Sequence, residues 1–417
     1  MDMVQSSALR QQRLRNWQAF ALLLGVLGEL FLAGDWYGFA AVMPFASKSM
    51  SLTPGAAGFA QGAFAITYAL GMIVWSPLGR RMSARALFAI GLVGAGIAMA
   101  WQSDVQSYPA LIALRFLIGF FDAAVWVGTM KLIVGWYPVK RHGLTMGVLL
   151  AAFSLAITLD FAIGIPVSAS YGWRVFFEGL GIATIAVGVL GALTIKGGPR
   201  DIGHPGFEWD DKLSHAATSS SAWAVLKSKW VFVGALAIFG DMFAISAVTT
   251  WVVPAFIEVQ GMPVASAAAI GSTMGFAQVV ILLIGGWLSD RVARTTMMKA
   301  GAAFCVLSAL SFVYATLSHL EWATMLAISA FSGVVVLSGG AIFSLVSEKY
   351  GESLAATAIG FAELGGIVST FIAPALMGAI IGTTHSFPIA FSVFAAVEVV
   401  ILAVLCITAR ERTGVVR

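Results

Sequence analysis

The sequence predicts an all-α membrane protein with twelve transmembrane helices in two six-helix halves. Three observations predict this fold class: the composition, the recurrence of long apolar runs, and one long polar interval near the middle of the chain. Hydrophobic residues make up 59% of the chain and charged residues 11%, and the mean hydropathy is +0.91. Water-soluble domains are about half apolar and about a quarter charged. Most of this chain's surface must therefore face lipid.

Twelve apolar runs are each long enough for a helix that crosses a bilayer, which takes about 20 residues at about 1.5 Å per residue. We expect helices because lipid tolerates only helices or closed barrels, and no alternating ten-residue pattern recurs. The predicted spans are residues 17–46, 57–79, 85–103, 108–136, 143–168, 173–195, 230–257, 264–289, 298–318, 322–346, 354–381 and 386–409.

The longest polar interval separates six spans from six. It contains Gly-Gly-Pro, His-Pro-Gly and a run of serines, which favour turns over a spanning helix. We therefore predict an N-terminal half at 1–195, a cytoplasmic linker at 196–229 and a C-terminal half at 230–417. With the N-terminus inside, 20 of the 24 lysines and arginines fall in cytoplasmic segments. The positive-inside rule then predicts a multi-pass protein of a bacterial inner (plasma) membrane with both termini in the cytoplasm.

Several functional classes are disfavoured by what the sequence lacks. The two cysteines lie in apolar runs and the five histidines in the gaps between them, without metal-ligand spacing. We therefore expect no metal and no cofactor. No nucleophile elbow or phosphate loop is present, so the sequence does not predict an enzyme. The formal charge is +4, but the basic residues form no continuous face, so nucleic acid is not an expected partner.

The two halves repeat one another weakly. Pro44 and Ser76 are 32 residues apart, and so are Pro254 and Gly286. Duplicated six-helix halves are typical of alternating-access carriers, whose substrate site lies near the middle of the membrane between the halves.

A loop motif then indicates a family. The segment between the eighth and ninth predicted spans reads Gly286-Trp-Leu-Ser-Asp290-Arg291-Val-Ala-Arg294 and resembles the cytoplasmic signature of the major facilitator superfamily. The resemblance implies two pseudo-symmetric six-helix bundles that move a small-molecule substrate by alternating access. It also implies a conformational role for Gly286, Asp290, Arg291 and Arg294. We expect such a protein to work as a monomer in the lipid bilayer. In the matching loop of the first half, Arg80 stands where the motif has its acid.

The fourth span contains a basic and an acidic residue on one face. Arg115 and Asp122 are seven residues apart, which places them two helical turns, or about 10 Å, apart along the axis. The pattern Arg115-Phe-Leu-Ile-Gly119-Phe-Phe-Asp122 resembles the anion:cation symporter branch, which includes organic acid/proton symporters. It is also similar to spinster-like lipid carriers, although both groups usually have Glu at the acidic position.

The first span supports the symporter resemblance. Asp35 precedes Pro44 by nine residues, as in the Asp-Arg…Pro pattern of that branch, and Gln61-Gly-Ala-Phe-Ala-Ile-Thr-Tyr68 looks like its second span. Trp36 replaces the arginine that would hold a substrate carboxylate in the family.

Ionisable side chains inside spans are functional candidates, because each costs several kcal/mol unless it is paired or faces water. Burial favours the neutral acid and a nearby arginine favours the carboxylate, so a carrier can bind and release a proton at such a site. The candidates for proton coupling are Asp35, Asp122, Glu29, Asp160, Asp241 and Glu363. The candidates for substrate binding are Arg115, Lys131, Trp36, Tyr37, Tyr68, Trp126 and Trp251. The alternative for Arg115 and Asp122 is a static buried pair that fixes helix packing.

Two transport functions remain open at the level of sequence. The first is proton-coupled uptake of a small organic acid anion, with Arg115 facing the carboxylate. The second is proton-driven export of amphipathic or cationic compounds, favoured by the excess of acids over bases in the spans. The span-five motif of drug antiporters, Gly-Pro-x-x-Gly-Gly, does not match the region from Thr158 to Pro166, which disfavours the second function. A sensor or a membrane enzyme is a third class, for which no motif or soluble domain is present.

Overall fold

The computed structural model describes residues 2–138, 141–204, 227–289 and 291–409. Within these ranges the secondary structure is helical, and twelve helices are long and apolar enough to cross a membrane. The first six are α1 Asp2–Met50, α2 Pro54–Leu78, α3 Ala84–Trp101, α4 Tyr108–Trp136, α5 His142–Tyr171 and α6 Trp173–Thr194. The later elements are α9 Lys229–Gln260, α10 Val264–Ser289, α11 Arg294–Leu317, α12 Trp322–Phe331, α13 Gly339–Thr384 and α14 Phe387–Thr408. Three short 3-10 helices are η1 Gln102–Asp104, η3 Pro199–Ile202 and η4 Ser332–Val336.

The predicted fold class is confirmed, and every predicted span overlaps one of the twelve helices. Helix starts follow local capping chemistry: α2, α3, α4 and α14 begin after a hydroxyl residue whose oxygen accepts a backbone N–H of the first turn. These capping residues are Thr53, Ser83, Ser107 and Ser386. In α2, α4 and α14 a proline occupies the first or second helical position, where its missing N–H costs nothing.

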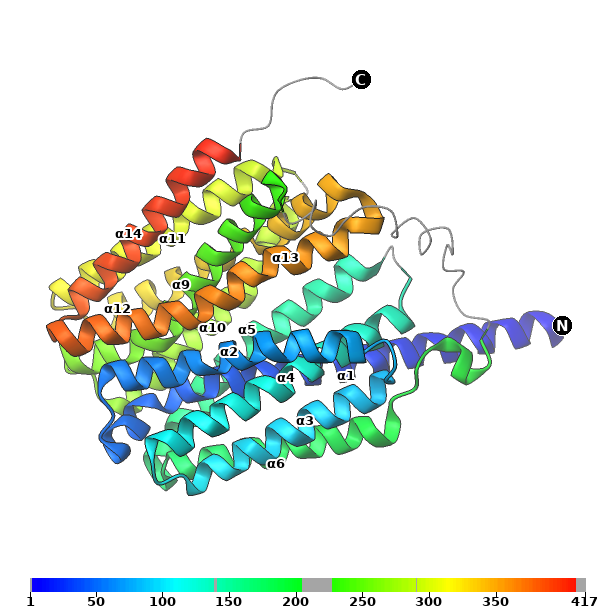
Figure 1. Cartoon of the computed structure of the whole chain (residues 1–417), viewed down its shortest axis with the longest axis horizontal. Coiled ribbons are helices and arrows are strands. Elements are labelled where there is room, and N and C mark those ends of the chain that lie inside the picture. Colours follow the sequence, from blue (N-terminus) through cyan, green and yellow to red (C-terminus); the bar gives the residue numbers. More distant parts are fainter. Residues whose placement is uncertain (1, 139–140, 205–226, 290, 410–417) are drawn as a thin grey trace.

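The tenth span departs from a simple helix. It begins as α12, continues through the 3-10 segment η4, and then enters α13. The predicted break between 346 and 354 is not a break in helical structure, because α13 runs on into the eleventh span. The intervening residues contain no proline, so the backbone is not forced to leave the helix there. Figure 1 shows α13, in orange, turning back on itself at one end of the bundle.

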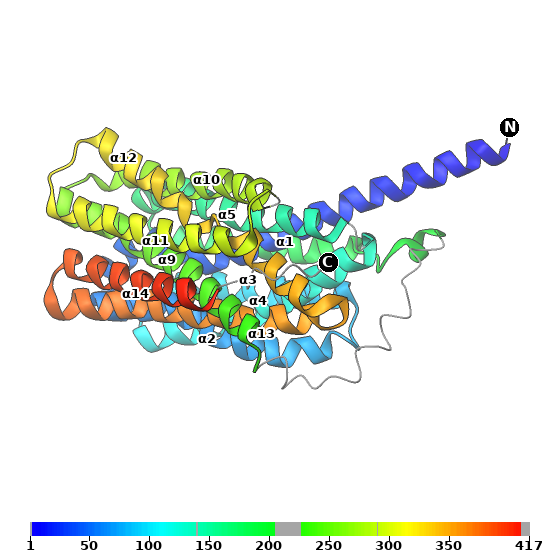
Figure 2. The same ribbon diagram turned by 90° about the horizontal axis from the view of Figure 1, so that it is seen from above.

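The two halves lie side by side, with α1–α6 (blue to green) on one side and α9–α14 (green to red) on the other (Figure 1). We call the end where α1 begins and α14 ends the terminal end, and the end of the Met50–Pro54 turn the distal end. The first part of α1 projects beyond the terminal end (Figure 2). The predicted linker 196–229 lies mostly outside the described residues, so the domain division remains a prediction.

The halves meet tightly toward the distal end, through α2 against α13 and α5 against α10. A Cβ atom on Gly58 of α2 would collide with the carbonyl oxygen of Pro374 in α13, and one on Gly271 of α10 would collide with the ring of Phe161 in α5. Such close approach of helix backbones in a membrane requires small residues at the contact. Closer to the terminal end, Gly360 of α13 has no atom within 4 Å of its Cβ position.

Candidate functional site

Arg115 lies at the centre of the N-terminal half and is fully buried. Its guanidinium donates to four main-chain carbonyl oxygens: Asp35 (2.9 Å), Trp36 (2.9 Å), Ala60 (3.2 Å) and Gln61 (3.4 Å). A guanidinium has five N–H groups, so these bonds use all but one of them. The charge therefore ties α4 to the backbones of α1 and α2.

The local sequence explains how Arg115 reaches those carbonyls. Gly119 lies one turn further along α4, and a Cβ atom there would collide with the carbonyl oxygen of Phe64 in α2. The missing side chain lets the two helix backbones approach closely. The Arg-x-x-x-Gly pattern thus brings α4 against α2 with Arg115 beside Ala60 and Gln61.

The Asp35 side chain contacts α6, while its carbonyl oxygen accepts a hydrogen bond from Arg115. Its Oδ1 accepts a hydrogen bond from the Thr184 hydroxyl at 3.2 Å, and its Oδ2 has no hydrogen-bond partner. Asp160 of α5 faces the same part of α1, because its Oδ1 lies 3.5 Å from the Cβ position of Gly34. Asp160 Oδ2 also lacks a hydrogen-bond partner. Asp35, Asp160 and Thr184 therefore form a polar cluster among α1, α5 and α6.

Asp122 is fully buried, and neither of its carboxylate oxygens has a hydrogen-bond partner. It lies within electrostatic range of Asp35, Arg115 and Glu29. The predicted common face of Arg115 and Asp122 agrees with the burial of both side chains on α4, but no hydrogen bond joins them. Arg115 therefore stabilises the charged form of Asp122 only through its longer-range electrostatic field.

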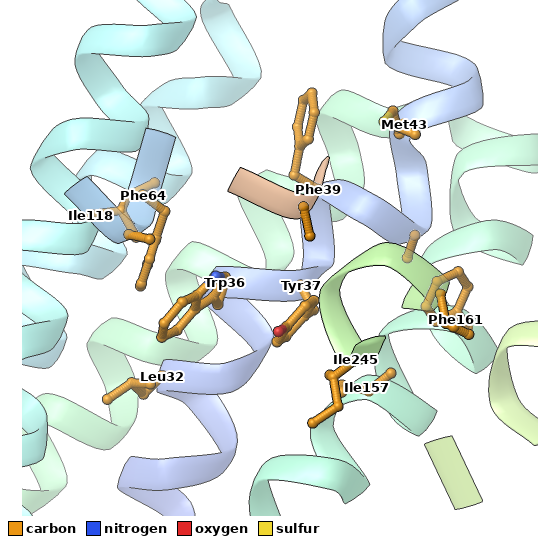
Figure 3. Packing of buried hydrophobic residues seen from close by; sticks show 14 of the residues in the cluster. Leu32, Trp36, Tyr37, Phe39, Met43, Phe64, Ile118, Ile157, Phe161 and Ile245 are labelled. Atoms are coloured by element: carbon orange, nitrogen blue, oxygen red, sulfur yellow. The ribbon is translucent and has the colours of Figure 1, made fainter. Parts of the chain in front are cut away.

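Trp36 belongs to an aromatic cluster, and Figure 3 shows its ring between those of Phe64 and Tyr37. Its ring lies 4.4 Å from that of Phe64, 5.2 Å from Tyr68, 5.9 Å from Tyr37 and 6.3 Å from Phe153, measured between centroids. The indole Nε1 is buried without a hydrogen-bond partner. Aromatic faces at these distances present an apolar surface with one polar group directed into it. Phe64 and Phe153 were not among the predicted site residues, since isolated aromatics in apolar runs carry no distinguishing signal.

Two features connect this region to the second half. The Tyr37 hydroxyl lies 3.2 Å from the Ser246 hydroxyl of α9. Glu29 of α1 is 3% exposed and interacts electrostatically with Glu363 of α13. Tyr68 interacts electrostatically with both of these acids and with Asp122. Acids from both halves thus lie within electrostatic range of Tyr68.

The remaining predicted binding residues lie away from this cluster. Lys131 Nζ donates to the carbonyl oxygens of Gly79 (2.7 Å) and Met82 (2.8 Å) at the terminal end. Trp251 is buried at the distal end, where Nε1 donates to Pro374 O at 3.2 Å. Trp126 is half-buried on α4, one turn beyond Asp122.

Asp241, the last proton-coupling candidate, lies inside the second half. The Ser338 hydroxyl is 2.9 Å from Asp241 Oδ1 and 2.8 Å from Oδ2. Among the described residues, the side chains that interact electrostatically with Asp241 are Glu398 and Cys305, both in the second half.

The described residues of the predicted conformational motif lie from the end of α10 to the start of α11. Arg294 donates to the carbonyl and hydroxyl oxygens of Ser289, the latter at 2.9 Å. Arg291 donates to Trp287 O at 3.1 Å and lies 3.8 Å from the Trp287 ring centroid. Gly286 has open space at its Cβ position. Asp290 lies outside the described residues. In the first half, where Arg80 stands at the position of the acid, Lys131 caps the carbonyl end of α2.

Twelve helices of membrane-spanning length in the described part of the chain, with acids and an aromatic cluster buried inside the bundle, define a multi-pass membrane transporter. The described residues contain no group of three or more His, Cys, Asp or Glu side chains that could hold a metal ion. The chain belongs to the Major Facilitator Superfamily, whose family model matches residues 25–366.

Relatives extend over most of the chain. A Cupriavidus necator protein named "Probable sulfoacetate transporter SauU" is 22% identical over 391 residues, covering 89% of this chain and 90% of that protein. The Escherichia coli "Probable galactarate/D-glucarate transporter GudP" is 23% identical and covers 82% of each chain. For an Arabidopsis thaliana relative, 22% identical, the chain spans 58% of that protein's length. The solved structure of a bacterial homologue of the lysosomal transporter Spinster, inward-facing and unoccupied, has the same fold (TM-score 0.72, 18% identity, 94% of this chain and 95% of that chain).

Proposed function

We propose that this protein takes up a small organic acid anion together with protons, by alternating access, across a bacterial inner membrane. The observation that carries the proposal is Asp122, which is fully buried without a hydrogen-bond partner in the field of Arg115. An isolated carboxylate is very costly in such a place, whereas the protonated acid is tolerated. A change in the distance to Arg115, or in access to water, would then load or release the proton.

The substrate class is supported by the relatives and by Arg115. The relatives named above are described as transporters of sulfoacetate or galactarate/D-glucarate, which are small organic anions. Arg115 keeps one N–H beyond its four carbonyl bonds, and its charge raises the local potential for an anion. Trp36 and Tyr68 would pack on the carbon skeleton, beside the unpartnered indole N–H. In this proposal Lys131 and Trp251 act in the helix contacts at the two ends of the bundle, without touching the substrate.

The arrangement of the halves fits one state of an alternating-access cycle. The tight contacts of α2 with α13 and of α5 with α10 lie toward the distal end. With cytoplasmic termini, the distal end is the periplasmic side, so this state is closed to the outside. The solved Spinster homologue, which shares the fold, is described as inward-facing.

The decisive test compares two transport modes in proteoliposomes that contain the unmodified protein or Asp122→Asn. Radiolabelled sulfoacetate, D-glucarate and tartrate are the probes. We expect the unmodified protein to accumulate an anion on an inward pH gradient, and Asp122→Asn to lose this accumulation while retaining counterflow exchange. Glu178→Gln, which changes an exposed acid on α6, is the matched control and should behave as the unmodified protein. Accumulation by Asp122→Asn on a pH gradient would contradict the role of Asp122.

A second function, proton-driven export of amphipathic or cationic compounds, is favoured by one observation. Tyr68 lies within electrostatic range of three acids, Glu29, Glu363 and Asp122. Most N–H groups of Arg115, in contrast, donate to backbone carbonyls. A thermal-shift screen of the purified protein against organic anions and lipophilic cations separates the two, because stabilisation grows as RT ln(1 + [L]/Kd). Stabilisation by lipophilic cations alone would replace the anion proposal with this one.

A further inference from the structure

A second buried pair of acids lies wholly within the C-terminal half. Asp241 is on α9 and Glu398 is on α14, two helices that pack against each other. Asp241 is 4% exposed and Glu398 is 0% exposed. The Glu398 carboxylate rests against the backbone next to Asp241, since its Oε2 lies 3.1 Å from the Cβ position of Gly240. The two acids are close enough to interact electrostatically.

The two carboxyl groups are held differently. Asp241 accepts the one hydrogen bond that the Ser338 hydroxyl donates, and that hydroxyl lies within 2.9 Å of both carboxylate oxygens. Neither oxygen of Glu398 has a hydrogen-bond partner, although the side chain is fully buried. A buried carboxylate without any donor is unstable, whereas a carboxylic acid needs far less solvation. The hydrogen bond from Ser338 thus favours the charged form at Asp241 and leaves Glu398 as the neutral partner.

Among the described residues, no cation is an electrostatic neighbour of Asp241 or Glu398. Among the described residues of the helices packed on α9, the titratable side chain that interacts with both acids is Cys305 of α11. Its Sγ is 3.8 Å from the carbonyl oxygen of Val335 in η4, the geometry of a weak S–H donor. Two neighbouring carboxylates in a low-dielectric site disfavour each other's ionisation, so the pair is suited to keep a proton.

We propose that Asp241 and Glu398 form a proton-binding site of the C-terminal half, in which the pair holds one exchangeable proton, carried by Glu398. The site is separate from the Asp35–Asp122 region of the first half, and its existence does not depend on the substrate. Gly240 provides the space for it, because a side chain there would press on the Glu398 carboxylate.

Ser338 connects this acid pair to the backbone of the tenth span. Ser338 stands between η4 and α13, at the point where the tenth span changes from 3-10 to α-helix. Short 3-10 segments inside helices often mark hinges. The charge on Asp241 determines how strongly it holds Ser338, so proton binding at the pair is linked to the geometry of the tenth span.

Infrared spectroscopy of the purified protein, titrated with pH in the absence of substrate, tests the proposal directly. The carbonyl stretch of a protonated carboxylic acid reports each neutral buried acid. We expect the unmodified protein to show a band that Glu398→Gln removes. In Asp241→Asn the same band should remain but titrate with a shifted midpoint, because its charged neighbour is gone. Asp104→Asn, which changes an exposed acid at the distal end, should alter neither feature.

Two results would overturn the proposal. An unchanged midpoint in Asp241→Asn would show that the acids are independent. A band that sodium chloride removes at constant pH, while choline chloride does not, would show that the pair binds sodium instead of a proton. Circular dichroism and thermal unfolding of each variant verify that it is folded. Because no substrate is added, failure here leaves the Asp122 transport test unaffected.

Discussion

Arg115 Nη2 lies 2.9 Å from the carbonyl oxygen of Trp36, so the buried cation of α4 holds the backbone of α1 at the residue that replaces the family's arginine. The Asp35 carbonyl, one residue earlier, accepts from Nη1 at the same distance. Both contacts act on main-chain atoms, which makes them independent of the side chains at positions 35 and 36. The arginine therefore has a structural role in addition to the electrostatic one proposed for it.

The first prediction follows from these bonds. Arg115→Lys should destabilise the protein by at least about 3 kcal/mol, because an ammonium cannot reproduce the fork and leaves buried carbonyls unpaired. Thermal unfolding of the purified protein in detergent measures the loss. Arg174→Lys is the matched control: Arg174 donates to only two carbonyl oxygens, of Ser103 and Val105, at the distal end. An equal loss in both variants would contradict the central role of Arg115 in packing.

The second prediction concerns the contact between the halves. Gly58→Ala should force α2 away from α13 at the distal end, because the added Cβ collides with the Pro374 carbonyl oxygen. We expect faster labelling of a cysteine placed at the buried Ala57 by a membrane-impermeant maleimide, with the exposed Cys406 replaced by serine. Gly147→Ala, at a position with no atom within 4 Å of the Cβ, is the control. Unchanged labelling in Gly58→Ala would mean that the distal contact does not control access.

The third prediction separates the two roles considered for Lys131. Its ammonium group binds the carbonyl oxygens of Gly79 and Met82 at the carbonyl end of α2, where a positive charge is favourable. Lys131→Met should therefore lower the stability by about 1 kcal/mol and leave the substrate affinity unchanged. Lys131→Arg should restore most of the stability. A tenfold weaker Kd for a transported anion in Lys131→Met, at equal stability, would instead place the lysine at the substrate.

The positions of the spans could be predicted closely, and α4 begins and ends at the predicted residues 108 and 136. Hydrophobic length is a local property that the bilayer thickness selects, so it can be read along the chain. The shared face of Arg115 and Asp122 follows likewise from helix periodicity. The helical structure that joins the tenth and eleventh spans was not predicted, because a short polar stretch between two apolar runs is equally typical of a loop.

The chemistry inside the bundle depends on contacts between segments far apart in the sequence. Arg115 and Lys131 are both cations of the fourth span, yet one binds four carbonyls at the centre and the other caps α2 at the terminal end. Asp241 pairs with Ser338, which is 97 positions away in the sequence. It also interacts with Glu398, which is further still along the chain. Neither could be inferred from spacing along one helix.

The sequence by itself determined the class of protein, the twelve helices and the residues that a membrane makes costly, because these depend on side-chain chemistry summed over short stretches. Only the tertiary structure decided which of the costly residues are satisfied. In the folded protein Arg115 donates to backbone carbonyls and Asp35 accepts from a threonine hydroxyl. Asp122 and Glu398 are buried without a hydrogen-bond partner. The physical reason is that a hydrogen bond requires two groups within about 3 Å, and helix packing sets that distance.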